Sequence, residues 1–394
     1  MFQLRRTAAV LSCAALAATA VGLTGCAADE SSASDGKGPI KIGASLELSG
    51  PTQSIGTVYK KALQLEVADL NKKGVLGGRK LKLIIKDNGT DPTKNITNVN
   101  NFINNEHVAA VITGGCSACT VPVTSIVEKK KVPMVALSSA SAVTEPVAKR
   151  QYTFKISPNP AQDADVLLKS LKKKGIKTIG LLNVSNTYGQ DGRKSVTALA
   201  KKEGIKVLSA QSFGQDDKDM SAQAAKLDSA DPDAVVMWAV MPAAGIAAKN
   251  LEDAGIKGKR VYMDAGAGAE LFVKGAQNAA EGTHMVFPQT LAINDVTATT
   301  PQVTDRKEWF KEYSSKYGNY SGFASFAADA LRMIKQAIQQ THGTDHVKLR
   351  DALETMGIDG LSGRIQNTAK QHSGLQESAL AVLEVKNGEW HLSN

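Results

Sequence analysis

The sequence predicts an α/β protein made of two lobes, each built on a doubly wound parallel sheet. Short apolar runs of strand type alternate with helical patterns from residue 40 onward, an order typical of parallel sheets covered by helices on both faces. After Pro158-Asn159-Pro160 the same alternation begins again. About 355 residues follow the N-terminal leader and tether, which is more than one hydrophobic core usually holds, and this length also favours two lobes.

The N-terminal segment has the pattern of an export signal. Arg5 and Arg6 precede an apolar, alanine-rich stretch that ends in Leu23-Thr24-Gly25-Cys26. The stretch falls short of the ~20 apolar residues of a spanning helix. It resembles a bacterial lipoprotein signal, which implies cleavage before Cys26, lipid on that residue and an extracytoplasmic protein anchored to the outer face of the cell membrane. We therefore predict a signal peptide over residues 1–25 and a flexible tether over 26–38; an ordinary secretory signal with an incidental cysteine is the alternative.

Composition argues against a nucleic-acid binder. The net charge of +9 falls to +7 when the signal and its two arginines are removed. Lysines cluster at predicted helix ends, as in residues 129–131 and 172–174, where they complement the negative end of the helix dipole. The sequence has no basic stripe interleaved with aromatic residues, so we expect no nucleic-acid partner.

The first half of the chain supplies a sheet with polar turns at one edge. Strands are expected at residues 40–46, 81–86, 109–113, 132–137 and 152–157, and helices at 53–71, 92–105 and 120–128. The turns around Ser117 and Ser139 both follow strands, and the C-terminal edge of the strands is where open α/β sheets bind ligands.

Residues 109–123 form the candidate centre of a binding site. A strand of buried type leads into Gly114-Gly115, and Thr120 with Pro122 is expected to open a helix. The unpaired N–H groups and the dipole at a helix start favour an anion, so the hydroxyls of Ser117 and Thr120 would hold a carboxylate or a polar oxygen there. An ordinary strand-to-helix turn without a ligand is the alternative.

The second half repeats the pattern of strands and helices. Strands are expected at residues 178–183, 205–210, 233–238, 260–263, 283–287, 379–385 and 390–392, with helices that end near Glu203, Asp228 and Asp253. Residues 302–316, 321–340 and 347–356 are further predicted helices. Late helices need a sheet to cover, and we expect them to cover the sheet of the first lobe.

Several short motifs run along the chain in a fixed order. They are Leu48-Ser49-Gly50-Pro51 with Gly56, Asp91-Pro92, residues 114–120, Thr187-Tyr188-Gly189, Pro232-Asp233-Ala234 and Gly360-Leu361-Ser362-Gly363. In this order, behind a lipoprotein signal, they resemble the leucine/isoleucine/valine-binding family of ABC-importer substrate-binding proteins over residues 40–394. The resemblance implies the type I periplasmic-binding-protein fold, in which three crossovers, here near Ser157, Pro288 and Gly374, join two lobes that close on a small ligand.

The lobes implied by the resemblance are discontinuous in sequence. The N-terminal lobe comprises residues 39–157 and 289–374, and the C-terminal lobe comprises residues 158–288 and 375–394. The resemblance also implies a binding protein without enzymatic activity, cofactor or metal, which delivers a small molecule to the permease and ATPase subunits of an ABC importer. We expect it to be a monomer.

Three positions carry over from the family pattern. Ser117 corresponds to the serine that holds the ligand carboxylate, and Ala140 to a position that offers backbone groups. Tyr188 corresponds to the aromatic residue that closes over the ligand from the second lobe.

Three other positions depart from the family pattern. Ile55 replaces an aromatic residue, Ala142 a threonine that binds the carboxylate, and Ala265 a glutamate that pairs with the α-ammonium group. Because of these departures the ligand stays open among aliphatic amino acids, amides, urea and small aromatic carboxylates. We expect a branched-chain or other aliphatic amino acid.

Neighbouring side chains are candidates to replace the missing groups. Ser139 or Ser141 is expected to supply the lost threonine hydroxyl, and Asp264 the lost carboxylate, although a surface acid at a strand end is an equal alternative for Asp264. Trp238 ends a neighbouring strand and is expected to line the pocket, with ordinary packing as the alternative.

The cysteines indicate an exported protein. Of the four, Cys13 lies in the signal and Cys26 carries the predicted lipid. Cys116 and Cys119 then meet an oxidising environment and are expected to form a short-loop disulfide. A thioredoxin-like redox pair is the alternative. In the family the first cysteine usually has a partner at the position of Thr90.

Two other classes of function fit the sequence less well. An enzyme would need motifs that are missing: there is no Gly-x-Ser-x-Gly or phosphate loop, and Gly266-Ala267-Gly268 lacks the third glycine of a dinucleotide fingerprint. His342 and His346 flank a helix-breaking turn, so no metal site is expected there. A ligand sensor would have to signal through a partner, because the sequence has no predicted spanning helix or cytoplasmic part.

Overall fold

The computed structural model describes residues 38–75, 77–268 and 270–393. The predicted signal peptide, Cys26 and the tether up to residue 37 lie outside the described residues, so lipid attachment stays a prediction. Within the described part of the chain, no helix is both long and apolar enough to span a bilayer.

The first large sheet has five parallel strands in the order β2-β1-β3-β4-β5. They are β1 Ile40–Leu46, β2 Leu81–Asp87, β3 Ala110–Thr113, β4 Met134–Ala136 and β5 Thr153–Lys155. The helices between them are α1 Gln53–Lys73, α2 Pro92–Asn104 and α3 Ser117–Lys130. Strand β1 is buried at every residue except Lys41 because it lies between β2 and β3 with helices on both faces.

The second large sheet has seven strands in the order β14-β13-β10-β9-β8-β6-β7. They are β6 Thr178–Val184, β7 Lys206–Phe213, β8 Ala234–Trp238, β9 Val261–Met263, β10 His284–Pro288, β13 Leu380–Lys386 and β14 Glu389–Leu392. Its helices are α4 Pro160–Lys173, α5 Thr187–Glu203, α6 Ser221–Ser229, α7 Ala243–Asp253 and α8 Glu270–Ala276. Strands β6 to β10 are parallel, whereas β13 and β14 form an antiparallel edge that the sequence analysis does not anticipate.

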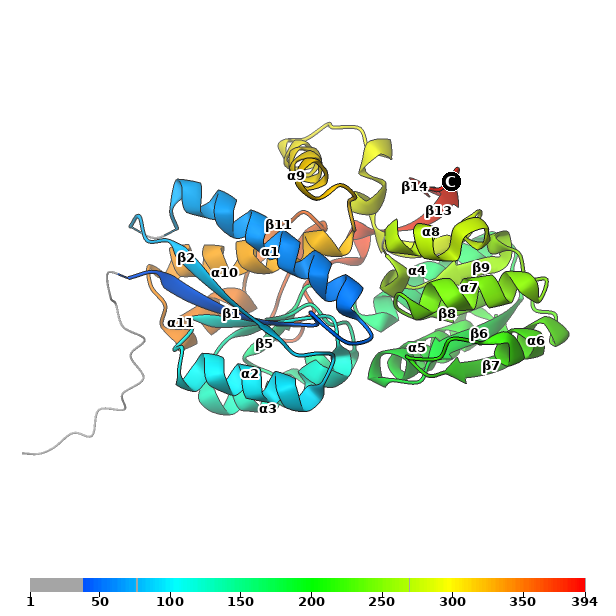
Figure 1. Cartoon of the computed structure of the whole chain (residues 1–394), viewed down its shortest axis with the longest axis horizontal. Helices are drawn as coiled ribbons and strands as arrows, with labels where there is room; N and C mark the ends of the chain where they lie inside the picture. Colours follow the sequence, from blue (N-terminus) through cyan, green and yellow to red (C-terminus); the bar gives the residue numbers. More distant parts are fainter. Residues whose placement is uncertain (1–37, 76, 269, 394) are drawn as a thin grey trace, which may run out of the picture. The chain divides into compact units, whose positions relative to one another are not determined.

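The chain passes between the two sheets three times, after β5, after β10 and before β13 (Figure 1). A bridge between Lys155 and Ser373 places two of these passages side by side. The predicted fold, two parallel-sheet lobes joined by three crossovers, is therefore confirmed. The exact lobe boundaries stay a prediction.

The C-terminal helices return to the first sheet. They are α9 Pro301–Tyr317, α10 Phe323–Thr341 and α11 His346–Glu354, and α10 packs against α1 (Figure 1). The buried carboxylate of Glu66 in α1 accepts hydrogen bonds from Trp309 Nε1 at 2.9 Å and from Arg332 Nε at 3.0 Å. These bonds fix the position of α1, which contributes one wall of the cavity described below.

A small antiparallel sheet, β11 Gly357–Asp359 and β12 Arg364–Gln366, is missing from the sequence prediction. Its strands are too short for an alternating pattern to be recognised. They flank the Gly360–Gly363 turn, in which the N–H groups of Leu361 and Ser362 donate to the buried carboxylate of Asp329 at 2.7 and 2.8 Å.

Candidate ligand-binding site

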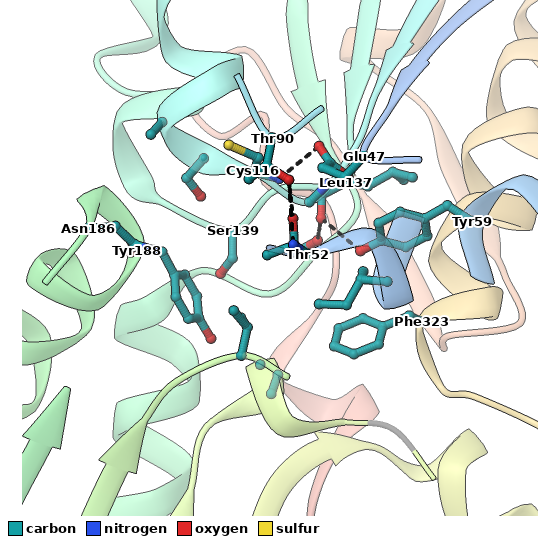
Figure 2. Close-up of a pocket in the computed structure, with 18 of the residues that line it drawn as sticks. Glu47, Thr52, Tyr59, Thr90, Cys116, Leu137, Ser139, Asn186, Tyr188 and Phe323 are labelled. Carbon is teal, nitrogen blue, oxygen red and sulfur yellow. Dashed lines mark hydrogen bonds between the residues drawn. The ribbon is translucent and has the colours of Figure 1, made fainter. Parts of the chain in front are cut away.

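A cavity of about 80 Å³ lies where the C-terminal ends of strands in the two large sheets face each other. Its residues come from segments that follow strands of both sheets and from helices α1, α3, α5 and α10: Glu47, Thr52, Ile55, Tyr59, Thr90, Gly115, Cys116, Ser117, Ala118, Leu137, Ser139, Ser157, Pro158, Asn186, Tyr188, Gln215, Val240, Ala265, Gly266, Phe323 and Phe326. Figure 2 shows Tyr188 on one side of the cavity, with Tyr59 and Phe323 on the other. The volume corresponds to roughly six water molecules, so the cavity suits a small ligand.

Helix α3 begins at the cavity wall, three residues earlier than predicted. It starts at Ser117 rather than at Thr120, and Pro122 lies inside the helix rather than in its first turn. As the first residues of the helix, Ser117 and Ala118 carry N–H groups without a partner inside it. Both residues line the cavity, so these donors lie where a ligand oxygen can accept from them.

The predicted disulfide between Cys116 and Cys119 is present in the structure. Cys116 is also the N-cap of α3, and its sulfur accepts the N–H of Cys119 at 3.1 Å. Thr90, at the position of the usual family partner, lines the cavity instead, and its hydroxyl is hydrogen-bonded to that of Thr52 at 3.0 Å. The disulfide therefore closes the first turn of the helix that borders the cavity.

The hydroxyl of Ser117 joins α3 to the turn after β4. Its Oγ accepts the N–H of Ala140 at 3.2 Å, and both residues are buried. Because the oxygen accepts this bond, the hydroxyl proton remains to be donated to a ligand. Ser117 lines the cavity, whereas Ala140 lies outside the lining and supports Ser117 from behind.

The two predicted replacement serines have different surroundings. Ser139 lines the cavity, and its Oγ donates to the carbonyl of Pro158 at 2.8 Å. Ser141 lies outside the lining; its N–H donates to Asp191 Oδ2 of α5 at 2.6 Å. That bond links the turn after β4 to a helix of the second sheet. Ser141 therefore holds the two sides of the cavity together rather than facing the ligand space.

A buried lysine holds the turn that contains Ser139. The ammonium of Lys155, fully buried in β5, donates to the carbonyls of Ser139 and Ala140, the latter at 3.3 Å. Burial lowers the pKa of Lys155 from 10.5 to about 8. Lys155 was not among the predicted site residues, because a lysine in a strand is usually exposed.

Glu47 is the main residue that the sequence analysis misses. It directly follows β1, it is 1 % exposed, and it lines the cavity (Figure 2). Its Oε1 accepts from Asn88 Nδ2 at 3.1 Å and from the N–H of Cys116 at 3.2 Å, and its Oε2 accepts from the N–H of Gly115 at 3.0 Å. Burial raises its pKa above the usual value of 4.5, while these hydrogen bonds oppose the shift.

Glycine at position 114 makes room for this carboxylate. A Cβ at Gly114 would lie 2.1 Å from Glu47 Oε2. A single acid between Leu46 and Leu48, just after a buried strand, was the available sequence signal for Glu47.

On the side of the second sheet, Tyr188 lines the cavity as predicted and Trp238 does not. Trp238 is fully buried, its ring centroid is 6.1 Å from that of Tyr188, and a Cβ at Gly192 would lie 2.2 Å from the indole. Trp238 therefore packs behind the ring of Tyr188. Asn186 and Gln215, which the sequence analysis misses, also line the cavity and are joined by a hydrogen bond of 3.1 Å from Asn186 Nδ2.

Asp264 lies behind the cavity wall and not in it. It is fully buried at the end of β9, and its two oxygens accept the N–H groups of Ala239 at 3.1 Å and Gly266 at 2.8 Å. It caps the short 3-10 helix Ala265–Ala267, whose first two residues line the cavity. Burial raises the pKa of Asp264 from 3.8 to about 8.

The sequence matches the model of one protein family, described as periplasmic binding protein, over residues 39–389. The chain belongs to this family. It is 25% identical over 330 residues to the leucine-, isoleucine-, valine-, threonine- and alanine-binding protein of Pseudomonas aeruginosa, an alignment that covers 83% of this chain and 85% of that protein.

Solved structures of the same fold resemble this periplasmic binding protein along most of its length. An extracellular ligand-binding receptor from Rhodopseudomonas palustris HaA2 has a TM-score of 0.83 at 23% identity, covering 91% of this chain and 100% of that chain. A solute-binding protein of an ABC transporter from Rhodopseudomonas palustris BisB5, in complex with 3,4-dihydroxybenzoic acid, has a TM-score of 0.79 at 18% identity, covering 90% and 95%.

Membership confirms four expectations at the level of the family. Periplasmic binding proteins are extracytoplasmic, they bind small molecules, and they work with components of ABC transporters; they are not enzymes. In this member, Glu47 is the charged residue among the described residues that line the cavity, and no lysine, arginine or histidine is among them.

Proposed function

We propose that this periplasmic binding protein is the substrate-binding lipoprotein of an ABC importer and that its ligand is a branched-chain or other aliphatic amino acid. In this proposal the protein is a monomer, and its two predicted lobes close over the ligand. The lobes are residues 39–157 with 289–374 and residues 158–288 with 375–394. The relative from Pseudomonas aeruginosa is named for binding amino acids of this kind.

The start of α3 is the observation that carries the proposal. Ser117 and Ala118 are the first two residues of α3, and both line the cavity with their N–H groups and the hydroxyl of Ser117 as available donors. Such donors at the positive end of a helix dipole suit a carboxylate without any basic side chain. Tyr188 lines the cavity from α5, on the side of the second sheet, and in this proposal it covers the bound ligand.

The remaining walls suit an aliphatic side chain. Ile55 and Leu137 line the cavity on the side of the first sheet, Val240 on the side of the second, and Phe323 and Phe326 come from α10. Each buried methylene group contributes about 0.8 kcal/mol, so leucine or isoleucine would bind more tightly than alanine.

A small aromatic carboxylate is the second candidate. Tyr59, Tyr188 and Phe323 supply aromatic walls, and the relative from Rhodopseudomonas palustris BisB5 was solved with a dihydroxybenzoic acid. Such a ligand would place the same carboxylate at Ser117 and would carry no ammonium group. Small amides and urea, or a sensing role through a partner, have no specific observation in their favour.

A thermal-shift screen of the processed protein against aliphatic amino acids, their amides, urea and benzoic acids tests the proposal. A ligand at ~100 times its dissociation constant stabilises the folded state by ~2.7 kcal/mol. We expect the largest shifts with leucine, isoleucine or valine, followed by one-site binding in calorimetry. Shifts with benzoic acids and none with amino acids would overturn the proposed ligand.

A further inference from the structure

The cavity contains a carboxylate outside the motifs that suggest the family, and we infer that Glu47 binds the ammonium group of the ligand. The inference rests on the proposed function, because it concerns the charged nitrogen of the proposed amino acid. It replaces the expectation that Asp264 takes over from the glutamate that is absent at Ala265.

The hydrogen bonds of Glu47 leave one oxygen open to a ligand. A carboxylate offers about two acceptor positions on each oxygen. Oε1 accepts from Asn88 and Cys116, whereas Oε2 accepts from Gly115; the N–H of Glu47 itself also interacts with its own carboxylate. Oε2 can therefore take one more donor, and Glu47 lines the cavity from which that donor would come.

The charge of Glu47 calls for a cationic partner. The side chain is almost completely buried, and no lysine, arginine or histidine is among the described residues that line the cavity. A buried carboxylate without a counter-charge is unfavourable. A ligand ammonium at Oε2 would supply the counter-charge when the cavity is filled.

Asp264 is poorly placed for the same task. It does not line the cavity, and its oxygens accept the backbone N–H groups of Ala239 and Gly266, which hold the turn in front of it. A Cβ at Gly266 would lie 2.5 Å from the hydroxyl of Tyr188 and 3.0 Å from Asp264 Oδ2, so this turn stands between the carboxylate and the ligand space. Asp264 is a positioning residue for the turn.

The proposed carboxylate and ammonium sites are adjacent. Glu47 accepts the N–H of Cys116, and Ser117 is the next residue of the chain. The ammonium and carboxylate of an α-amino acid are bonded to the same carbon atom, so one head group can reach both sites. The first sheet would then bind the whole head group, and the second sheet would only have to cover it.

Calorimetry with a pair of ligands that differ only in the charged nitrogen tests the inference. L-leucine and L-2-hydroxy-4-methylpentanoate share the carboxylate and the side chain. Loss of one partner of a buried charge pair weakens binding strongly, so we expect the wild type to prefer leucine by about 30-fold or more. In Glu47→Gln the preference should fall below about threefold, while Asp264→Asn should retain it.

The ratio of the two affinities is measured within one protein and does not depend on the fraction that is folded. Glu47→Asp keeps the charge and provides a second variant: it should still prefer leucine while binding it more weakly. An unchanged preference in Glu47→Gln, or a preference lost in Asp264→Asn instead, overturns the inference and leaves the proposed ligand intact. Binding of neither ligand by the wild type, at concentrations that give shifts with benzoic acids, overturns the proposed function as well.

Discussion

Replacing Ser117 by alanine removes a hydroxyl that has two hydrogen-bond partners in this account, the N–H of Ala140 and the ligand carboxylate. The loss of each bond can be given an expected free-energy cost. Its Oγ accepts the N–H of buried Ala140 at 3.2 Å, and its proton would be donated to the ligand carboxylate. A hydrogen bond to a charged group contributes about 1.5–3 kcal/mol. The dissociation constant for leucine should therefore rise about 10- to 150-fold in Ser117→Ala.

The same substitution leaves the N–H of Ala140 buried without its acceptor. The free energy of unfolding without ligand should fall by about 1–3 kcal/mol, measured by urea denaturation. Ser141→Ala is the matched control, because Ser141 lies in the same turn but outside the cavity, where its Oγ donates to Asn159 Oδ1 at 2.9 Å. Leucine affinity in the control should change less than about threefold, which is within 0.7 kcal/mol. Equal affinities of wild type and Ser117→Ala would refute the carboxylate site.

Three further predictions concern stability and location. Burial raises the pKa of Asp264 from 3.8 to about 8, so the folded state holds this proton more tightly than the unfolded state. The free energy of unfolding should therefore fall as the pH rises between these two values, by up to ~1.4 kcal/mol per pH unit. In urea unfolding, Asp264→Asn should show a flatter decline of this free energy with pH, and an equally steep decline would contradict the assignment. Gly192→Ala places a Cβ 2.2 Å from the indole of Trp238, so the free energy of unfolding in urea should fall by about 1–3 kcal/mol. Ligand binding should also weaken, because a displaced indole would shift Tyr188. Wild-type stability and affinity in this variant would show that the packing tolerates the change. Cys26→Ser removes the residue that is predicted to carry the lipid, and stable anchoring needs more than one lipid chain. The precursor should therefore stay uncleaved, or the protein should be released from the membrane. Cell fractionation that finds a processed and membrane-bound variant would exclude the lipid anchor.

Local patterns predicted the elements of the fold well. Apolar runs such as Ile40–Leu46 and capping signals such as Asp91-Pro92 predicted β1 and α2 closely, because the features that form them lie within a few residues. The start of α3 was predicted at Thr120 because Pro122 is typical of a first helical turn, but in the structure Cys116 is the N-cap and the helix starts at Ser117. The short strands β11 and β12 had no detectable period.

Some of the candidate site residues line the cavity and others do not. Ser117 and Tyr188 line the cavity as expected, because each lies at a helix start next to a strand end. Trp238 was expected in the cavity because it ends a strand, but Gly192 leaves room for its ring behind Tyr188.

Glu47 was missed because its surroundings come from distant parts of the chain. It depends on Asn88 and on the Gly115 and Cys116 N–H groups, which are 41, 68 and 69 residues away. No local pattern in the sequence predicts such a set of contacts.

A crystal structure of the protein with L-leucine tests the central claim most directly. We expect the ligand carboxylate within about 2.7–3.2 Å of the N–H groups of Ser117 and Ala118, with the ammonium at the same distance from Glu47 Oε2 and the side chain against Ile55 and Phe323. A leucine bound in the cavity with its carboxylate turned away from α3, or with its ammonium on the side of Asp264, would contradict the account.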